Sequence, residues 1–218
     1  MSTATGARSG AGELLADRAY VELRDRIVTL AIPPGAPINE ETLGRELEIG
    51  RTPVREAIKR LALENLVAVY PRRGTFATAI DITDLAHVSD VREQLEGHAA
   101  FRAAQRLTPT QRRELDELVA RVSAPDGDDE SLMRLDADVH RFVYRCAGNP
   151  YLRETLERYL NLSLRIWYLV LGRLPHLSER VREHRDLLVA VRAGEAERAR
   201  AIAIEHVSTF EDEIRGVL

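Results

Sequence analysis

Residues 51–78 read RTPVREAIKRLALENLVAVYPRRGTFAT, and this stretch decides the fold of the N-terminal part of the chain. The apolar residues Val54, Ile58 and Leu61 recur every three or four positions, which predicts an amphipathic helix. Thr52 stands at the start of this run, where its hydroxyl could accept a hydrogen bond from a free backbone N–H. We therefore expect Thr52 to cap the helix.

A β-hairpin is predicted directly after this helix. The runs at 67–70 and 75–78 are β-prone, and the loop between them contains Gly74. Upstream, apolar residues at helical spacing predict a helix over about 15–30 and a shorter helix capped by Asn39. Three helices and a hairpin, with a tight turn between the last two helices, describe a winged helix-turn-helix.

The charge of this region indicates DNA binding. Six basic side chains and only two acidic ones lie within residues 51–73, although the whole chain has a formal net charge of -4. In a helix-turn-helix the second helix enters the major groove, where arginine can bind guanine through two hydrogen bonds. The residues that we expect to contact DNA are Arg51, Thr52 and Arg55 on this helix and Arg72, Arg73 and Gly74 on the hairpin.

After residue 80 the sequence pattern becomes entirely helical. Breaks rich in Gly, Pro and Asp divide it into six predicted helices, at 83–106, 109–123, 130–146, 150–172, 178–193 and 195–216. Short connections between long helices predict an antiparallel bundle. The chain is therefore predicted to be mostly α, with a disordered tail at 1–12, a winged helix-turn-helix domain at 13–80 and a helical domain at 81–218.

Polar side chains interrupt the apolar stripes of three of these helices. Asp136 and His140 share one face with two valines, and His184 and His206 lie on the stripes of the last two helices. A buried carboxylate without a partner is costly, so another group must satisfy it. One carboxylate and three imidazoles that converge in a core would bind a divalent ion such as Zn, Ni, Co or Mn. The alternatives are an ordinary pair of Asp with the His four residues later, and core histidines that pack without metal.

Three further polar residues are candidates to bind a small ligand. Arg92 lies on the apolar stripe of the helix predicted at 83–106. It could face an anionic ligand, or pair with Glu96 four residues later. Asn161 and Arg165, in a later helix, are candidates of the same kind.

The motifs of both halves resemble a family of bacterial regulators. The N-terminal half resembles the GntR family of transcription regulators through Pro34-Gly35, Leu43, the motif RTPVREAI at 51–58, Leu61, Leu66 and Arg73-Gly74-Thr75. The C-terminal half resembles the FadR-like branch of that family, which has an all-helical effector domain called FCD. The matching pieces are the motif VREQLE at 91–96, Asp136 with His140, Gly148-Asn149-Pro150, Glu183-His184-Arg185 and His206.

This resemblance implies a homodimer that binds an operator with dyad symmetry and responds to a small metabolite. In metal-containing members the ligands are an Asp, a His four residues later and two further His. They correspond here to Asp136, His140, His184 and His206. The effector of such members is often a carboxylate that coordinates the metal, with an arginine such as Arg92 nearby. Members that recognise acyl-CoA lack this constellation, so the resemblance argues against such an effector.

Two features depart from the family pattern. Gly50 stands where the family usually has Ser or Thr, and the lost hydroxyl could remove a cap or a phosphate contact. Four acidic residues beside the predicted DNA-reading helix should limit non-specific DNA affinity. They are Glu40, Glu41, Glu46 and Glu48.

These observations together predict a dimeric repressor controlled by a small carboxylate bound at a divalent metal. The chain lacks an apolar run long enough to span a bilayer, and its only cysteine, Cys146, cannot form an internal disulfide. Both features favour the cytoplasm and exclude the secreted and membrane classes. Two alternatives are a metal-dependent hydrolase that uses the same Asp and His residues, and a regulator whose core polar network holds no metal.

Overall fold

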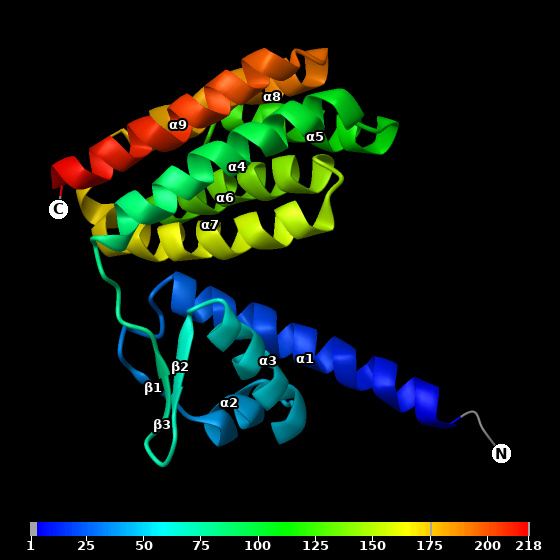
Figure 1. The fold of residues 1–218 in the computed structure, drawn as a ribbon, viewed down its shortest axis with the longest axis vertical. Coiled ribbons are helices and arrows are strands. Elements are labelled where there is room, and N and C mark those ends of the chain that lie inside the picture. The colour runs from blue at the N-terminus through cyan, green and yellow to red at the C-terminus, as the bar shows by residue number, and fades with distance from the viewer. Residues whose placement is uncertain (1–3, 175, 218) are drawn as a thin grey trace. The chain divides into compact units, whose positions relative to one another are not determined.

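The computed structural model describes residues 4–174 and 176–217, and the chain divides into two compact units (Figure 1). The first unit ends at Asp81 and the second begins at Ile82. Each unit has its own apolar core, in agreement with the two kinds of sequence pattern on either side of residue 80.

The first unit is a winged helix-turn-helix, as the sequence predicted. Its elements are α1 (Ala4–Val28), β1 (Pro37–Ile38), α2 (Glu40–Glu46), α3 (Arg51–Leu63), β2 (Val67–Tyr70) and β3 (Gly74–Ala77). The strands form an antiparallel sheet in the order β1-β3-β2. The sequence predicted β2 and β3 but missed β1, because a strand of two residues carries no recognisable alternation.

The core of this unit lies where α1 packs along α3. Leu23 and Ile27 of α1 and Ile58 and Leu61 of α3 are buried there, at the three- and four-residue spacing that the sequence shows. The predicted cap of α2 is also present, because the Asn39 side chain accepts hydrogen bonds from two backbone N–H groups of its first turn. This packing presents the opposite face of α3 to solvent.

Two boundaries differ from the sequence prediction. α1 begins at Ala4, within the segment at 1–12 that we expected to be disordered, and residues 1–3 lie outside the described part of the chain. Extending a helix that already exists fixes only one residue for each hydrogen bond gained, so little apolar character is required. α3 begins at Arg51, and its N-cap is Gly50, which offers no side-chain hydrogen bond. Thr52 is therefore an exposed residue of the first turn, and its predicted capping role is wrong.

The second unit is the predicted all-helical antiparallel bundle. Its elements are α4 (Asp84–Arg106), α5 (Pro109–Ser123), α6 (Asp129–Cys146), α7 (Pro150–Val170), a 3-10 turn (Leu171–Arg173), α8 (Leu177–Ala193) and α9 (Ala196–Val217). Each α-helix begins and ends within two residues of its predicted limits. Among the described helices, none is both long and apolar enough to cross a lipid bilayer.

Helix α4 lies in the middle of this bundle, with α9 on one side and α6 and α7 on the other (Figure 1). Gly97 allows the close approach of α4 to α9, because a Cβ atom at this position would lie 2.8 Å from Cγ1 of Ile204. The tight contact fixes the neighbouring turn of α4, which carries Glu96, against the centre of the bundle.

Candidate functional site

The four residues predicted to bind metal converge in the core of the second unit. Asp136 and His140 come from α6, His184 from α8 and His206 from α9. One potential ligand atom of each residue lies within 4.8 Å of those of the other three. All four side chains are buried, so water cannot satisfy their polar atoms freely. We call them the Asp/His cluster.

Asp136 is the centre of the Asp/His cluster. Its Oδ1 lies 2.6 Å from Nε2 of His184 and 3.9 Å from Nε2 of His206. Its Oδ2 lies 3.6 Å from Nε2 of His140, which is too long for a hydrogen bond. The helix pair between Asp136 and His140 is thus present as a longer ion pair, and the hydrogen-bond contact of Asp136 is with His184.

Several buried atoms of the Asp/His cluster have no hydrogen-bond partner among the described residues. They are Oδ2 of Asp136, Nε2 of His140, Nδ1 of His184 and both ring nitrogens of His206. Unsatisfied buried polar atoms are uncommon in proteins and call for an explanation. Lone pairs on one carboxylate and three imidazoles are the donors that divalent transition metals prefer, so this set fits a metal ion.

The charges of the Asp/His cluster also suit a cation. Burial acts to raise the pKa of Asp136, but the imidazoles of His184 and His140 hold this pKa well below its usual range. Burial, together with the charges of His184 and His140, lowers the pKa of His206 well below the usual histidine value. The site thus keeps an ionised carboxylate and a neutral imidazole at pH 7, which are the protonation states that bind metal.

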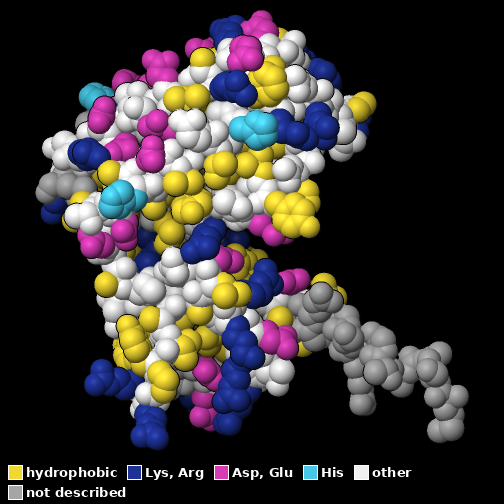
Figure 2. Space-filling view, in the orientation of Figure 1, with side chains coloured by type: hydrophobic (Ala, Val, Ile, Leu, Met, Phe, Trp, Pro, Cys, Tyr) yellow, Lys and Arg dark blue, Asp and Glu magenta, His cyan; other side chains and the backbone are white. Residues whose placement is uncertain are grey.

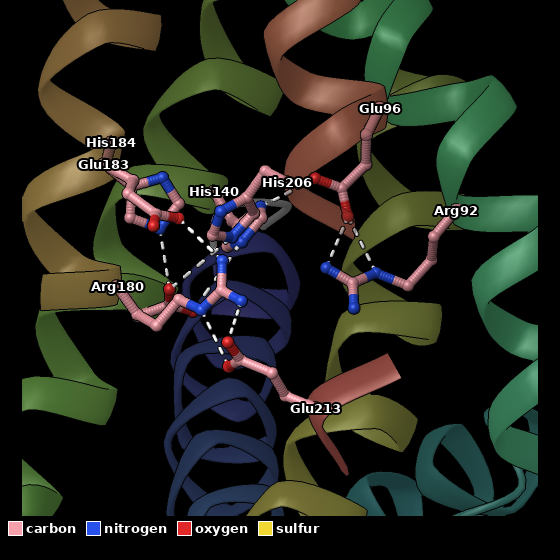
Figure 3. A network of polar contacts seen from close by, with 9 residues as sticks. Arg92, Glu96, His140, Arg180, Glu183, His184, His206 and Glu213 are labelled. Carbon is pink, nitrogen blue, oxygen red and sulfur yellow. Dashed lines mark hydrogen bonds and ion pairs between the residues drawn. The ribbon is translucent and has the colours of Figure 1, made fainter. Parts of the chain in front are cut away.

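A second layer of charged residues supports the Asp/His cluster from α4 (Figure 3). Nδ1 of His140 lies 2.7 Å from Oε2 of Glu96, and Oε1 of Glu96 accepts a hydrogen bond of 2.7 Å from Nε of Arg92. The Arg92 guanidinium also lies over the Trp167 ring, 5.0 Å from its centroid. Of the two expectations for Arg92, the pair with Glu96 is the one that the structure contains.

The predicted DNA-contacting residues lie on the surface of the first unit. Arg51 and Arg55 are exposed on the first turns of α3, where each pairs with an acidic residue of α2. Arg51 lies 3.3 Å from Glu41, and Nε of Arg55 lies 2.7 Å from Oε2 of Glu40. Basic side chains, with acidic ones beside them, gather at the end of this unit that carries the turn between β2 and β3 (Figure 2). DNA phosphates would have to displace these acidic partners to reach both arginines.

The tip of the wing is a tight turn that carries the other predicted DNA contacts. Arg72 has a positive φ of 62° and Gly74 a φ of 107°, so the backbone reverses within three residues. Arg72 and Arg73 are exposed there. Gly74 is required at its position because its φ is strained for any residue with a Cβ.

Both units match known protein families. Residues 15–77 match the model of bacterial regulatory proteins of the gntR family, and residues 87–209 match that of the FCD domain. The FCD match alone spans more than half of the chain. The chain belongs to the GntR family of transcription regulators. It is a DNA-binding regulator, and the hydrolase alternative is wrong because the family and its relatives regulate transcription.

Similar proteins span nearly the whole of this GntR-family chain. An uncharacterised HTH-type transcriptional regulator from the unstable DNA locus of Streptomyces ambofaciens is 30% identical over 203 residues, which cover 91% of this chain and 84% of that protein. The HTH-type transcriptional repressor RspR of Escherichia coli K12 is 24% identical over 200 residues, with 91% and 88% covered. The solved structure of E. coli McbR/YncC has the same fold, with a TM-score of 0.81, 24% identity and coverage of 93% and 97%.

In this GntR-family regulator a pocket of about 420 Å³ lies between α8 and α9 and reaches the Asp/His cluster. His184 and His206 form part of its wall, and the basic residues Arg180 and Arg198 lie beside them. Arg180 spans the two helices, since it pairs with Glu213 of α9 and its Nη1 lies 2.8 Å from Oε2 of Glu183 (Figure 3). Three acidic residues, Glu183, Asp186 and Glu205, also line the pocket, which reaches two of the histidines.

Sequence reasoning missed Glu96 and Arg180 as parts of this site. A usable signal existed for Arg180, which precedes His184 by one helical turn on the same face of α8. Glu96 was noticed only as a partner of Arg92, because its contact with His140 joins positions 44 residues apart.

The remaining effector candidates lie on α7. Asn161 is buried, and its Oδ1 lies 3.5 Å from Nη2 of Arg141. Burial lowers the pKa of Arg165 to about 10. Arg92 is thus the candidate that reaches the Asp/His cluster through a described contact, by way of Glu96. Roles of all three in effector binding stay predictions.

Glu40→Gln is expected to raise DNA affinity by about two- to fivefold. The substitution frees Arg55 from an exposed ion pair, and such pairs contribute about 0.2–1 kcal/mol. Fluorescence anisotropy with a duplex selected from a random library measures the change. Glu46→Gln is the matched control, because it removes the same charge from α2 but its partner is Arg26 of α1. Equal effects of the two substitutions would show that Glu40 does not restrain Arg55.

The metal-free protein is expected to lose stability as the pH falls below about 6.5. Because the folded state depresses the pKa of His206, the unfolded state binds a proton that the folded state does not. The stability that neutral His206 contributes is complete above the pKa of this histidine in the unfolded chain, and it falls by about 1.4 kcal/mol per pH unit below that pKa. Calorimetry of chelator-treated protein between pH 7.5 and 5 measures this slope. A His206→Asn variant with the same slope would contradict the assignment.

Proposed function

We propose that this GntR-family regulator is a dimeric repressor whose operator binding is controlled by a small carboxylate at a divalent metal. Asp136, His140, His184 and His206 would hold the ion. The observation that carries this proposal is the set of buried donor atoms in the Asp/His cluster that lack hydrogen-bond partners. RspR, a relative that matches most of the chain, is a transcriptional repressor, which supports repression as the role proposed here.

The metal would supply a Lewis-acidic centre that attracts an anionic ligand. Four protein ligands leave open positions on an ion that accepts five or six, so Zn, Ni, Co and Mn are all candidates. His184 and His206 line the pocket between α8 and α9. An anion in this pocket would therefore approach the metal from the α8 and α9 side.

A small carboxylate suits the chemistry of this pocket. Its basic residues are Arg180 and Arg198, and an oxyanion would bind their N–H donors by replacing the glutamates with which each is paired in this structure. A volume of about 420 Å³ is in the range of small-molecule sites and suits a small organic acid. We further propose that Arg92, Asn161 and Arg165 contribute to effector recognition.

DNA recognition is assigned to the exposed residues of α3 and the wing. We propose that Arg51, Thr52 and Arg55 contact the major groove, and that Arg72, Arg73 and Gly74 contact the adjoining backbone or minor groove. Two copies of the chain, joined through their helical units, would place two such surfaces on an operator with dyad symmetry. The regulator would act in the cytoplasm, where the DNA lies.

A metal-free core network is the second candidate for the Asp/His cluster. The contact of 2.6 Å between Nε2 of His184 and Oδ1 of Asp136 favours it, since it stabilises part of the cluster without an ion. In that case the chain would bind its operator without any response to metal.

Operator titrations with metal-loaded and chelated protein test the proposal. Fluorescence anisotropy would follow a selected duplex while dicarboxylates, hydroxy acids and sugar acids are added. We expect at least one carboxylate to change operator affinity by about 5- to 150-fold in the loaded protein, and by less than twofold in the chelated protein. Identical responses of both forms would reject metal-dependent control. By linkage, an acid that weakens operator binding must itself bind the operator complex more weakly by the same factor.

A further inference from the structure

Glu96 lies between an arginine and a metal-ligand candidate in the core of the second unit (Figure 3). Its Oε2 lies 2.7 Å from Nδ1 of His140, and its Oε1 accepts a hydrogen bond of 2.7 Å from Nε of Arg92 and lies 2.5 Å from Nη2 of the same guanidinium in an ion pair. Both Arg92 and Glu96 are buried, with side chains 2% and 4% exposed. Each carboxylate oxygen thus has its own partner, and solvent does not compete for either.

This arrangement determines the position of the proton on His140. An arginine remains charged in a protein core, and a carboxylate that forms a hydrogen-bonded ion pair with it is ionised. An ionised carboxylate can only accept, so Nδ1 of His140 must carry the hydrogen that lies between the two groups. In the neutral ring Nε2 then keeps its lone pair, and Nε2 is the nitrogen that faces Asp136 in the Asp/His cluster.

We propose that Glu96 is a positioning residue that holds His140 in the tautomer able to bind the metal. Arg92 acts one step further out, because it fixes Glu96 and is itself held over the Trp167 ring. A carboxylate behind a ligating histidine orients the ring and makes its other nitrogen more basic. This inference rests on the proposed metal site, but its first prediction concerns the metal-free protein.

The same chain of contacts ties the Asp/His cluster to α4. The carboxylate of Glu96 is a polar link from His140 of α6 to α4, and α4 begins at Asp84, three residues after the first unit ends. Glu96 thus joins the Asp/His cluster to the first helix of the second unit.

Glu96→Gln tests the proposal with little change of shape. A glutamine can accept from Nδ1, but its NH₂ can also donate to Nδ1 and so permit the opposite tautomer. That tautomer would place a hydrogen on Nε2, where it blocks the metal. We expect long-range ¹H–¹⁵N NMR to find the Nδ1–H form of His140 in the wild-type metal-free protein and a mixture in the variant. The affinity for Zn or Co should fall by about 10- to 100-fold.

Glu93→Gln is the matched control for this experiment. It removes the same charge from α4 three residues earlier, and it should leave both the tautomer of His140 and the metal affinity unchanged. Arg92→Lys keeps the buried charge but loses the two-pronged contact, so it should weaken metal binding less than Glu96→Gln. Circular dichroism establishes that each variant is folded.

The outcomes separate this inference from the proposed function. An Nε2–H tautomer of His140 in the wild-type protein, or unchanged tautomer and metal affinity in Glu96→Gln, would overturn the positioning role. Failure of the wild-type protein to bind any divalent metal, with the Nδ1–H tautomer present and lost in Glu96→Gln, would support the positioning of His140 and reject the metal site.

Discussion

Arg55→Ala is expected to abolish specific operator binding while the fold stays intact. Arg55 is exposed on the first turns of α3, where its guanidinium can bind a guanine edge through two hydrogen bonds. Such a contact contributes about 1–3 kcal/mol, and a dimer on two half-sites would lose it twice. The fold should survive, because the exposed ion pair with Glu40 contributes about 1 kcal/mol at most. Anisotropy titrations with the selected operator and with a scrambled duplex measure the loss of specificity.

Arg113→Ala is the control for the change in net charge. Arg113 is an exposed residue of α5 in the helical unit, so its loss should leave operator affinity within a factor of two. Operator affinity of the Arg55→Ala variant within a factor of two of the wild type would show that α3 does not read the DNA as proposed.

Asp136→Asn is expected to remove metal binding from the helical unit. The amide keeps the volume and one acceptor but loses the charge that lies within 4 Å of Nε2 of His140, His184 and His206. The affinity loss should exceed the about 10- to 100-fold that follows removal of a supporting hydrogen bond. A metal present at 1,000 times its Kd adds about 4 kcal/mol of stability to the wild type, and this gain should vanish in the variant.

Asp138→Asn is the matched control, because it lies on the same helix two residues later. Asp138 is exposed and pairs with Arg121 across 3.0 Å, on the outside of the bundle. Thermal unfolding with and without Zn or Ni compares the two variants. An equal rise in Tm on metal addition in wild type and Asp136→Asn would place the metal elsewhere, while both variants should keep operator binding in the absence of effector.

The fold was largely predictable because it rests on local signals. Apolar residues at helical spacing gave the helices, and Asn39 and the Gly and Pro breaks gave their ends. The prediction was wrong where the local signal misled. Thr52 has a hydroxyl that could cap a helix, but it lies inside α3. The first residues of α1, from Ala4, carry no apolar stripe from which a helix could be predicted.

The candidate site was predictable only in part, because its partners come from distant positions. The stripes of α6, α8 and α9 placed one carboxylate and three imidazoles in the core, and those residues do converge. Periodicity says which face a residue occupies but not which residue it meets across the core. The contact of Glu96 with His140, and that of Arg180 with Glu213, depend on how the helices cross, and no pattern within one helix reveals this.

Elemental analysis of untagged protein, purified without added metal and expressed per chain, tests the central claim most directly. The account predicts about one Zn, Ni, Co or Mn per chain. The same analysis of Asp136→Asn should find less than a tenth of this amount. Absence of any divalent metal from the wild-type protein, even after incubation with Zn, Ni or Mn, would contradict the metal site and with it the proposed control by a carboxylate.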